Sequence, residues 1–498
     1  VILVKTVKGD GMGAQGKNTA HQYKNIPVEE RITVAKELGI PLDDQAAMAA
    51  QFYRPAEESA ELTYMRAQRE KLDGYLPNRS VSCAPLQIPQ LERFKEVLAG
   101  SGKRQVSTTM VMVRLLSSLL RMPEVAKYIV PIVPDEARTF GMDGLFKAAG
   151  IYSADGQKYR PVDADSLLPY REANDGQILQ EGICEVGAMA SFMAAGSAYS
   201  VHGLPMIPFY IFYSMFGFQR VGDMIWSCGD MMCKGFLLGG TAGRTTLNGE
   251  GLQHQDGHSH ILASTVPSLL SYDPAFGYEV AVIVREGMRR MYEDQEDIFY
   301  YLTLYNENHL MPDMAEVLAA TNQSQEGLVQ GILQGGYCFS RTSEAPAQIH
   351  LLSSGSIMQQ VMAAASQLES MGFKVAIWSM TSFVELQRQA MAVDRNNREA
   401  AAKDLQVSNL QQMFAGASGA FVAVTDYMAS LALGIAAWMP ESFEVLGTDG
   451  FGLSESRPAL RAHFEVDSNA IVRTALASLH KQQLLSDKEW SKLMQNVQ

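Results

Sequence analysis

The fold is decided at residues 179–230, which read LQEGICEVGAMASFMAAGSAYSVHG followed by LPMIPFYIFYSMFGFQRVGDMIWSCGD. Small apolar residues predict a closely packed helix over Glu181–Ser200. An apolar run predicts a buried strand over Pro205–Met215, and a helix is expected over Gly217–Met232. Strands that alternate with helices in this way are typical of a parallel α/β sheet.

One carboxylate, that of Glu185, lies inside the small apolar helix. Two interpretations of this residue stay open on the residues alone. It is either a structural ion neutralised by a basic partner, or an acid held in a wall of low dielectric, where burial and neighbouring groups shift its pKa.

Aromatic and histidine side chains follow the same helix. The aromatic residues within the predicted strand and directly after it are Phe209, Tyr210, Phe212, Tyr213 and Phe216. They are most simply core residues, although two of them could offer faces to a flat heterocycle. The segment TTLNGEGLQHQDGHSH at 245–260 adds His254, His258 and His260 beside Asp256. Zinc needs regular ligand spacing and a fourth partner, so we favour a substrate-facing histidine, with the others in structural hydrogen bonds. Together these residues predict a catalytic pocket.

The alternation of strands and helices continues along the chain. Further strands are predicted at Tyr128–Val133, Gly235–Leu238, Ser268–Asp273, Ile298–Leu304, Gln348–Leu352, Lys374–Ser379, Phe421–Val424 and Phe443–Leu446. Met311–Glu326 is a candidate boundary between two regions of this kind. The predicted fold class is therefore α/β, with tandem doubly wound, mostly parallel sheets.

The N-terminal segment is predicted to be a short buried strand over Val1–Val7, followed by the turn Gly9-Asp10-Gly11. The chain has no initiator methionine and begins inside this strand pattern, so we expect further sequence upstream. A loop rich in Gly, Lys and Asn over Met12–Lys24 carries His21. This loop is either a mobile lid or a plain surface connection.

Two acids, Asp135 and Glu136, come directly after the strand predicted at Tyr128–Val133. Functional residues gather at the carboxyl ends of parallel strands, but acids at this position are also suited to cap a helix. Both interpretations stay open. Residues 152–171 are polar and without periodicity, and we expect this loop to become ordered when a ligand binds.

The composition argues against two classes of partner. A net charge of −13 over 498 residues argues against binding to nucleic acid. No apolar run is long enough for a transmembrane helix, so a membrane is not expected either. The chain has 5 cysteines and no CxxC pair, which predicts reduced thiols in a cytosolic compartment.

Four long strings carry a family resemblance. They are VPDEARTFGMDGLF (133–146), PMIPFYIFYSMFGFQRVGD (205–223), GRTTLNGEGLQHQDGHSH (243–260) and VLGTDGFGLSESRPALRAHFEVD (445–467). Together they resemble the homodimeric type of bacterial pyruvate dehydrogenase, the thiamine-diphosphate-dependent first enzyme of its complex, in the transketolase-like superfamily. The resemblance covers essentially the whole chain. It implies that residues 1–84 are the tail of a diphosphate-binding domain that is largely missing, 85–314 a pyrimidine-binding domain and 315–498 a transketolase C-terminal-like domain.

The resemblance also implies an activity. A homodimer in the bacterial cytoplasm would decarboxylate pyruvate oxidatively with thiamine diphosphate and Mg²⁺. It would acetylate the lipoyl domain of a dihydrolipoyl acetyltransferase component, yielding carbon dioxide and, through the complex, acetyl-CoA. The family's cation-binding GDG is followed by an Asn pair, which Gly9-Asp10-Gly11 lacks at that spacing, so the cation ligands are expected upstream. The alternatives are an inactive dimerising fragment without the cation and diphosphate site, or a related transketolase-like 2-oxo acid dehydrogenase.

Four residues are implied to contact the cofactor. Glu185 matches the glutamate that hydrogen-bonds N1′ of the aminopyrimidine, a contact that a dry setting strengthens. Tyr213 and Phe216 match positions that wall the pyrimidine, and Ile183 is expected to support the bent cofactor.

Five further residues are implied to line the active site. Asp135 and Glu136 match acidic positions, and His254 matches a histidine on the substrate side. Lys8 matches an active-site lysine at a strand end, and His21 matches the histidine of a mobile inner loop that is linked to lipoyl transfer.

Overall fold

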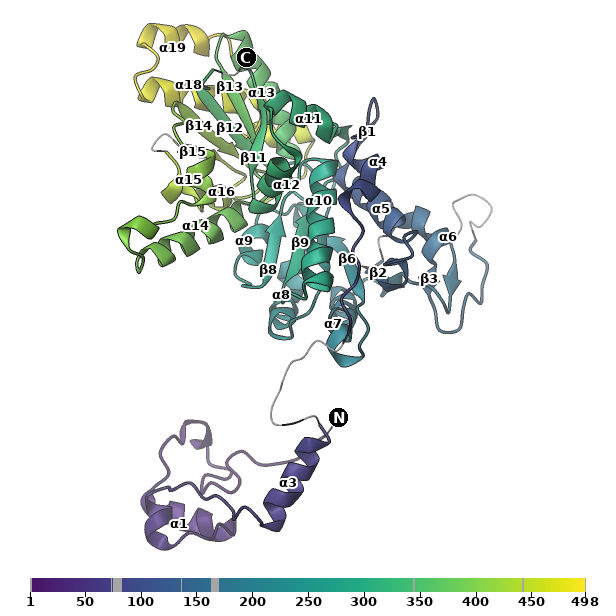
Figure 1. The fold of residues 1–498 in the computed structure, drawn as a ribbon, viewed down its shortest axis with the longest axis vertical. Helices are drawn as coiled ribbons and strands as arrows, with labels where there is room; N and C mark the ends of the chain where they lie inside the picture. The colour runs from purple at the N-terminus through teal and green to yellow at the C-terminus, as the bar shows by residue number, and fades with distance from the viewer. Residues whose placement is uncertain are drawn as a thin grey trace. The chain divides into compact units, whose positions relative to one another are not determined.

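The structure is a computed structural model that describes residues 2–72, 74, 83–135, 137–162, 170–343, 345–440 and 443–497. The chain divides into two compact units, Val1–Ser80 and Val81–Gln498, which Figure 1 colours from purple to yellow along the sequence. Each unit is described by itself. Among the described residues, no helix combines the length and the apolar character that a membrane crossing needs.

The first unit is built from short helices. They are η1 (Ala20–Gln22), α1 (Val28–Glu37), α2 (Asp44–Met48) and α3 (Ala60–Glu70). The strand predicted at Val1–Val7 is wrong for the described residues 2–7, where Ile2, Leu3 and Val4 are 89%, 93% and 76% exposed. A strand is stable only beside a partner strand, and the described part of this unit contains none.

The second unit contains a parallel sheet. Its strands in the described residues follow the order β5 (Leu179–Gln180), β2 (Ile129–Val133), β6 (Ile207–Tyr213), β7 (Phe236–Gly240), β9 (Phe299–Thr303) and β8 (Leu269–Tyr272). Every neighbouring pair is parallel. All five residues of β7 and of β9 are buried, because a parallel sheet is covered on both faces and its central strands are apolar throughout.

Helices cover this sheet and connect its strands (Figure 1). They are α4 (Lys95–Leu98), α5 (Thr108–Leu119), α6 (Phe146–Ala149), α7 (Glu185–Val201), α8 (Ser214–Asp230), α9 (Ser259–Ala263) and α10 (Gly277–Met288). Two small sheets lie beside it, an antiparallel pair of β1 (Gln105–Val106) with β10 (His309–Leu310) and a parallel pair of β3 (Ile151–Tyr152) with β4 (Glu172–Ala173). The loop predicted at 152–171 connects β3 to β4. Residues 163–169 of this loop lie outside the described part.

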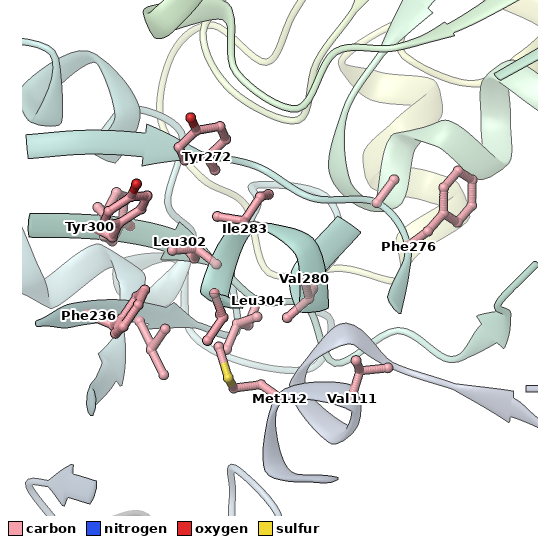
Figure 2. Packing of buried hydrophobic residues seen from close by; sticks show 14 of the residues in the cluster. Val111, Met112, Phe236, Tyr272, Phe276, Val280, Ile283, Tyr300, Leu302 and Leu304 are labelled. Carbon is pink, nitrogen blue, oxygen red and sulfur yellow. The ribbon is translucent and has the colours of Figure 1, made fainter. Parts of the chain in front are cut away.

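The core forms where α10 and α5 pack on the sheet. Figure 2 shows Val280 and Ile283 of α10 beside Leu302 of β9, with Met112 of α5 below these residues in the view. These four side chains are at most 1% exposed. Burying an aliphatic side chain contributes about 1.5–3 kcal/mol to the stability of the fold, so these contacts stabilise the packing of α5 and α10 on the sheet.

A second sheet follows in the chain. Its strands in the described residues are, in order, β11 (Tyr337–Arg341), β13 (Val375–Ser379), β12 (Ile349–Ser353), β14 (Ala420–Val424) and β15 (Phe443–Leu446). The pairs among β13, β12, β14 and β15 are parallel, whereas β11 is antiparallel to β13. The surrounding helices are α11 (Met314–Thr321), α12 (Gln325–Gln334), α13 (Met358–Ser370), α14 (Phe383–Asn397), α15 (Asn409–Met413), α16 (Ala429–Leu433), α17 (Arg457–His463), α18 (Ser468–Lys481) and α19 (Asp487–Met494).

The predicted fold class, α/β with tandem and mostly parallel sheets, is confirmed. One strand of the second sheet, the edge strand β11, was not predicted. The candidate boundary Met311–Glu326 stays a prediction, and this segment contains the helix α11. Asp313 caps that helix by accepting a hydrogen bond from the Ala315 backbone N–H, which is the usual role of an acid at a helix start.

Candidate functional site

The predicted pocket residues lie where strands of the first sheet end. Asp135 follows β2, Glu185 follows β5, Phe216 follows β6 and His254 follows β7. These four strands are neighbours and parallel, so their carboxyl ends share one edge of the sheet, which is where ligands of open α/β sheets bind.

Glu185 is the first residue of α7, and its side chain is only 11% exposed. The residue before it, Cys184, caps the helix by accepting a hydrogen bond from the Gly187 backbone N–H at 3.3 Å. The Tyr210 hydroxyl of β6 donates to the Glu185 carbonyl oxygen at 3.3 Å. The helix start is therefore fixed to the sheet, and the carboxylate is held at its edge.

The basic partner of Glu185 is Arg220, which the sequence analysis did not identify. Arg220 Nη1 on α8 donates to Glu185 Oε1 at 2.5 Å, and the guanidinium carbon lies 3.9 Å from the centre of the Phe216 ring. Residues four apart on a helix are neighbours, but the predicted helix Gly217–Met232 did not include Phe216, and only the observed start of α8 at Ser214 places Phe216 and Arg220 on the same helix. The structure therefore shows the first interpretation of Glu185, an ion with a basic partner, and the guanidinium of that partner lies over the Phe216 ring.

Three rings form a cluster next to this ion pair. The centre of the Phe216 ring lies 5.9 Å from that of Tyr213 and 5.0 Å from that of His254, and Tyr213 and His254 are 5.2 Å apart. Phe140 supports Tyr213 from the buried side at 5.4 Å. His254 Nδ1 is buried and has no hydrogen-bond partner within the described residues. An unpaired buried polar atom costs free energy, and a ligand that bonds it would remove that cost.

The other two histidines of the segment make separate contacts. His258 Nε2 lies 2.7 Å from Gln219 Nε2. His260 is buried, with Nδ1 at 2.6 Å from Ser271 Oγ and Nε2 at 2.9 Å from Thr303 Oγ1, and its burial lowers the pKa of the imidazole. The structure thus brings only His254 of the three to the ring cluster.

The loop that carries His254 is anchored to the second sheet. Asp426, just after β14, accepts hydrogen bonds from the Thr245 backbone N–H at 2.8 Å, from Thr245 Oγ1 at 2.6 Å and from Thr246 Oγ1 at 2.6 Å. The Arg244 guanidinium donates to the carbonyl oxygens of Thr448 and Gly450. The loop follows directly after β7 in the chain, and these buried contacts attach it to the second sheet as well.

Two of the remaining predicted residues of this unit, Asp135 and Ile183, lie at the surface. Asp135 is exposed, and its Oδ1 accepts a hydrogen bond from Gln180 Nε2 of β5 at 3.2 Å. Ile183 is 74% exposed just before α7. Glu136 lies outside the described residues.

Lys8 and His21 belong to the first compact unit. Lys8 Nζ lies 2.7 Å from His21 Nδ1, so the two residues predicted from this segment meet each other. Lys8 is in a turn rather than at the end of a strand. Both side chains are at the surface of this unit.

Comparison with known proteins matches two families to the chain. Residues 86–312 match the middle domain of the pyruvate dehydrogenase E1 component, and residues 335–467 match the transketolase-like C-terminal domain. The chain is 48% identical over 483 residues to the pyruvate dehydrogenase E1 component of Pseudomonas aeruginosa, which covers 96% of this chain and 54% of that protein. It is 46% identical over 487 residues to the Escherichia coli K12 protein of that name, covering 97% of this chain and 53% of that protein. The chain thus spans about half the length of the curated relatives it matches.

Solved structures show the same fold at low sequence identity. Transketolase from Campylobacter jejuni superimposes with a TM-score of 0.60 at 16% identity, covering 94% of this chain and 62% of that one. Transketolase from Leishmania mexicana gives a TM-score of 0.58 at 15% identity, with 92% and 58% covered. The fold is therefore transketolase-like.

Proposed function

Because the chain belongs to the pyruvate dehydrogenase E1 component family, we propose that it supplies the pyrimidine-binding half of a thiamine-diphosphate site that decarboxylates pyruvate. The observation that carries this proposal is the Glu185 carboxylate, 11% exposed and next to the Phe216 ring at the carboxyl edge of a parallel sheet.

The residues at this edge fit the aminopyrimidine of that cofactor. Glu185 offers a carboxylate to accept a hydrogen bond from N1′, Phe216 and Tyr213 offer ring faces and edges, and His254 Nδ1 is a buried atom without a partner in the described residues. When bound, thiamine diphosphate supplies a carbon nucleophile and an electron sink for loss of the pyruvate carboxyl group. Glu185 holds the proton at N1′, and the apolar helix around it strengthens that bond.

The other predicted residues are proposed to act on the substrate side. His254 orients the pyruvate carbonyl, and Asp135 and Glu136 provide acidic groups near the reacting centre. Ile183 supports the bent cofactor. Lys8 and His21, which contact each other at 2.7 Å, are proposed to act in the transfer to a lipoyl group.

The domain division follows the same proposal. Residues 1–84 belong to a diphosphate-binding domain, 85–314 to the pyrimidine-binding domain and 315–498 to the C-terminal domain. The family matches at 86–312 and 335–467 support the last two. The Mg²⁺ ligands are proposed to lie in sequence outside this chain, because Gly9-Asp10-Gly11 lacks the Asn pair that follows the family's cation-binding GDG.

The partner proposals rest on the exposed surface and on the relatives. Ile183 and Val186 at the start of α7 and Val201 at its end are 74%, 54% and 65% exposed, and these exposed apolar side chains support a second copy of the chain as a partner. The name E1 component given to the bacterial relatives supports a dihydrolipoyl acetyltransferase component as the partner complex and the bacterial cytoplasm as the place of action.

The test measures carbon dioxide release from carboxyl-labelled pyruvate by the natural protein with thiamine diphosphate and Mg²⁺. We expect release from pyruvate and little from 2-oxoglutarate, with no ketol transfer from xylulose 5-phosphate. Turnover of either of the last two substrates, but not of pyruvate, would establish the related 2-oxo acid dehydrogenase or a transketolase instead. Calorimetry tests the dimerising-fragment alternative, which tight thiamine diphosphate binding by the isolated chain would refute.

A further inference from the structure

Arg220 contacts both the Glu185 carboxylate and the face of the Phe216 ring, the two groups that the proposed function assigns to the aminopyrimidine. Its Nη1 donates to Glu185 Oε1 at 2.5 Å, and its guanidinium carbon lies over the Phe216 ring at 3.9 Å from the ring centre. A guanidinium is flat, stacks on aromatic faces and presents N–H donors in its plane. An aminopyrimidine has the same three properties.

The other neighbours of Phe216 meet its ring differently. The Tyr213 ring stands at 74° to it and the His254 ring at 56°, so both approach obliquely, whereas Arg220 covers the ring face. An entering heterocycle that stacks on this face and bonds this carboxylate therefore competes with the Arg220 side chain.

The exposures of the two partners indicate which one gives way. The Arg220 side chain is 46% exposed, and that of Glu185 is 11% exposed. Arg220 can turn into solvent by rotating its own side chain, and α8 stays packed on β6 and β7. Glu185 is held at the first turn of α7 through the cap of Cys184 and the bond from Tyr210.

We infer that Arg220 is a gate residue, which occupies the aminopyrimidine position in the empty site and leaves it when the cofactor ring enters. This inference rests on the proposed function, because it takes the pyrimidine contacts from it.

The test compares the natural protein with its Arg220→Met variant. The probe is thiamine diphosphate with Mg²⁺, and the readouts are the dissociation constant by calorimetry and the association rate by stopped-flow fluorescence. Removing one part-exposed ion pair and one cation–π contact is expected to tighten binding and speed association by roughly three- to thirtyfold. Arg220→Lys keeps the charge but loses the flat stacking group, so its values should fall between those of the other two proteins.

The matched control is Arg341→Met. Arg341 lies over the Trp378 ring at 5.7 Å in the second sheet, so it is a similar contact away from the site, and its loss should leave both readouts unchanged. If Arg220→Met binds thiamine diphosphate equally or more weakly while the natural protein binds it well, the inference that Arg220 is a gate residue is wrong and the proposed function stands. If the natural protein binds no thiamine diphosphate, both proposals fail. Unchanged thermal unfolding of Arg220→Met excludes a folding defect as the cause of a weaker affinity.

Discussion

At the scale of single residues, the site depends on the carboxylate of Glu185 and on the Arg220 guanidinium that donates a hydrogen bond to it. The sequence shows Glu185 among small apolar residues, and the structure leaves its side chain 11% exposed. Arg220 approaches Glu185 from another helix, and the sequence does not record how two helices face each other. Among the three histidines, we predicted one facing the substrate and the others in structural hydrogen bonds. His260 is buried against Ser271 and Thr303, and His258 Nε2 lies 2.7 Å from Gln219 Nε2, whereas the substrate-facing role of His254 stays a prediction.

His254 is the residue whose loss should affect substrate more than fold. Its Nδ1 is buried without a partner in the described residues, so it is available to a ligand. We expect His254→Ala to lower kcat/KM for pyruvate by about 100-fold, the usual range for a positioned acid–base group. Steady-state kinetics measure this, with His202→Ala, at the exposed end of α7, as the control. A variant with the kinetics of the natural protein would remove His254 from the site.

At the scale of elements, the long buried strands were predictable, and so were the edge strands β8 and β15, whereas the edge strand β11 and the strands of two residues were not. The apolar runs at β2, β6, β9, β12, β13 and β14 each stand out because both faces are covered. The edge strand β11, YCFSR, has polar and exposed residues at its end, and strands of two residues such as β5 exist only because a neighbour pairs with them. Helix α8 also begins earlier than expected, at Ser214 instead of Gly217.

The position of α8 depends on Gly217. A Cβ added there would lie 2.1 Å from Phe212 Cε2, on a ring that is fully buried in β6. We expect Gly217→Ala to destabilise the fold by about 1–3 kcal/mol through overpacking, and to lower the activity because α8 carries Phe216 and Arg220. Thermal or chemical unfolding measures the change.

Gly222→Ala is the control for that substitution in the same helix. A Cβ at Gly222 meets no atom within 4 Å, and alanine is the better helix former by up to about 1 kcal/mol. We expect this variant to be neutral or slightly more stable. If both variants behave alike, the close contact with Phe212 does not position the helix.

At the scale of the whole second unit, buried carboxyl groups join the two sheets. Glu279 on α10 accepts hydrogen bonds from Tyr337 and Ser379 at 2.6 Å each, and Asp426 accepts them from Thr245 and Thr246. In the sequence these acids resemble ordinary polar positions at the ends of elements. Their burial follows only from the packing of one sheet on the other, so it could not be predicted from local patterns.

Asp426 should make the stability of this junction depend on pH. Burial raises the pKa of its carboxyl from 3.8 to about 6, against the opposing effect of hydrogen bonds from Thr245 and Thr246. A group whose pKa is higher in the folded state contributes stability below its unfolded pKa and loses it as the pH rises through the folded value. At 1.36 kcal/mol per pKa unit, the whole shift corresponds to about 3 kcal/mol, and roughly 2 kcal/mol of it is lost between pH 4 and pH 7, because the unfolded carboxyl is already partly ionised at pH 4.

The measurement is the unfolding free energy of the natural protein and of Asp426→Asn between pH 4 and pH 7. Asparagine does not titrate, so the stability advantage of the natural protein over the variant should shrink as the pH rises. A difference that stays constant, or grows, over this interval would show that Asp426 is not the group responsible.

The central claim is that the Glu185 carboxylate activates a thiamine ring held at the edge of the first sheet. The most direct measurement is hydrogen–deuterium exchange at C2 of bound thiamine diphosphate, in the natural protein and in Glu185→Gln. Glu181→Gln serves as the control, since Glu181 is an exposed carboxylate nearby. We expect the exchange rate to fall by at least about 100-fold in Glu185→Gln and to be unchanged in Glu181→Gln, with the cofactor bound in both. Exchange in Glu185→Gln as fast as in the natural protein would contradict the claim.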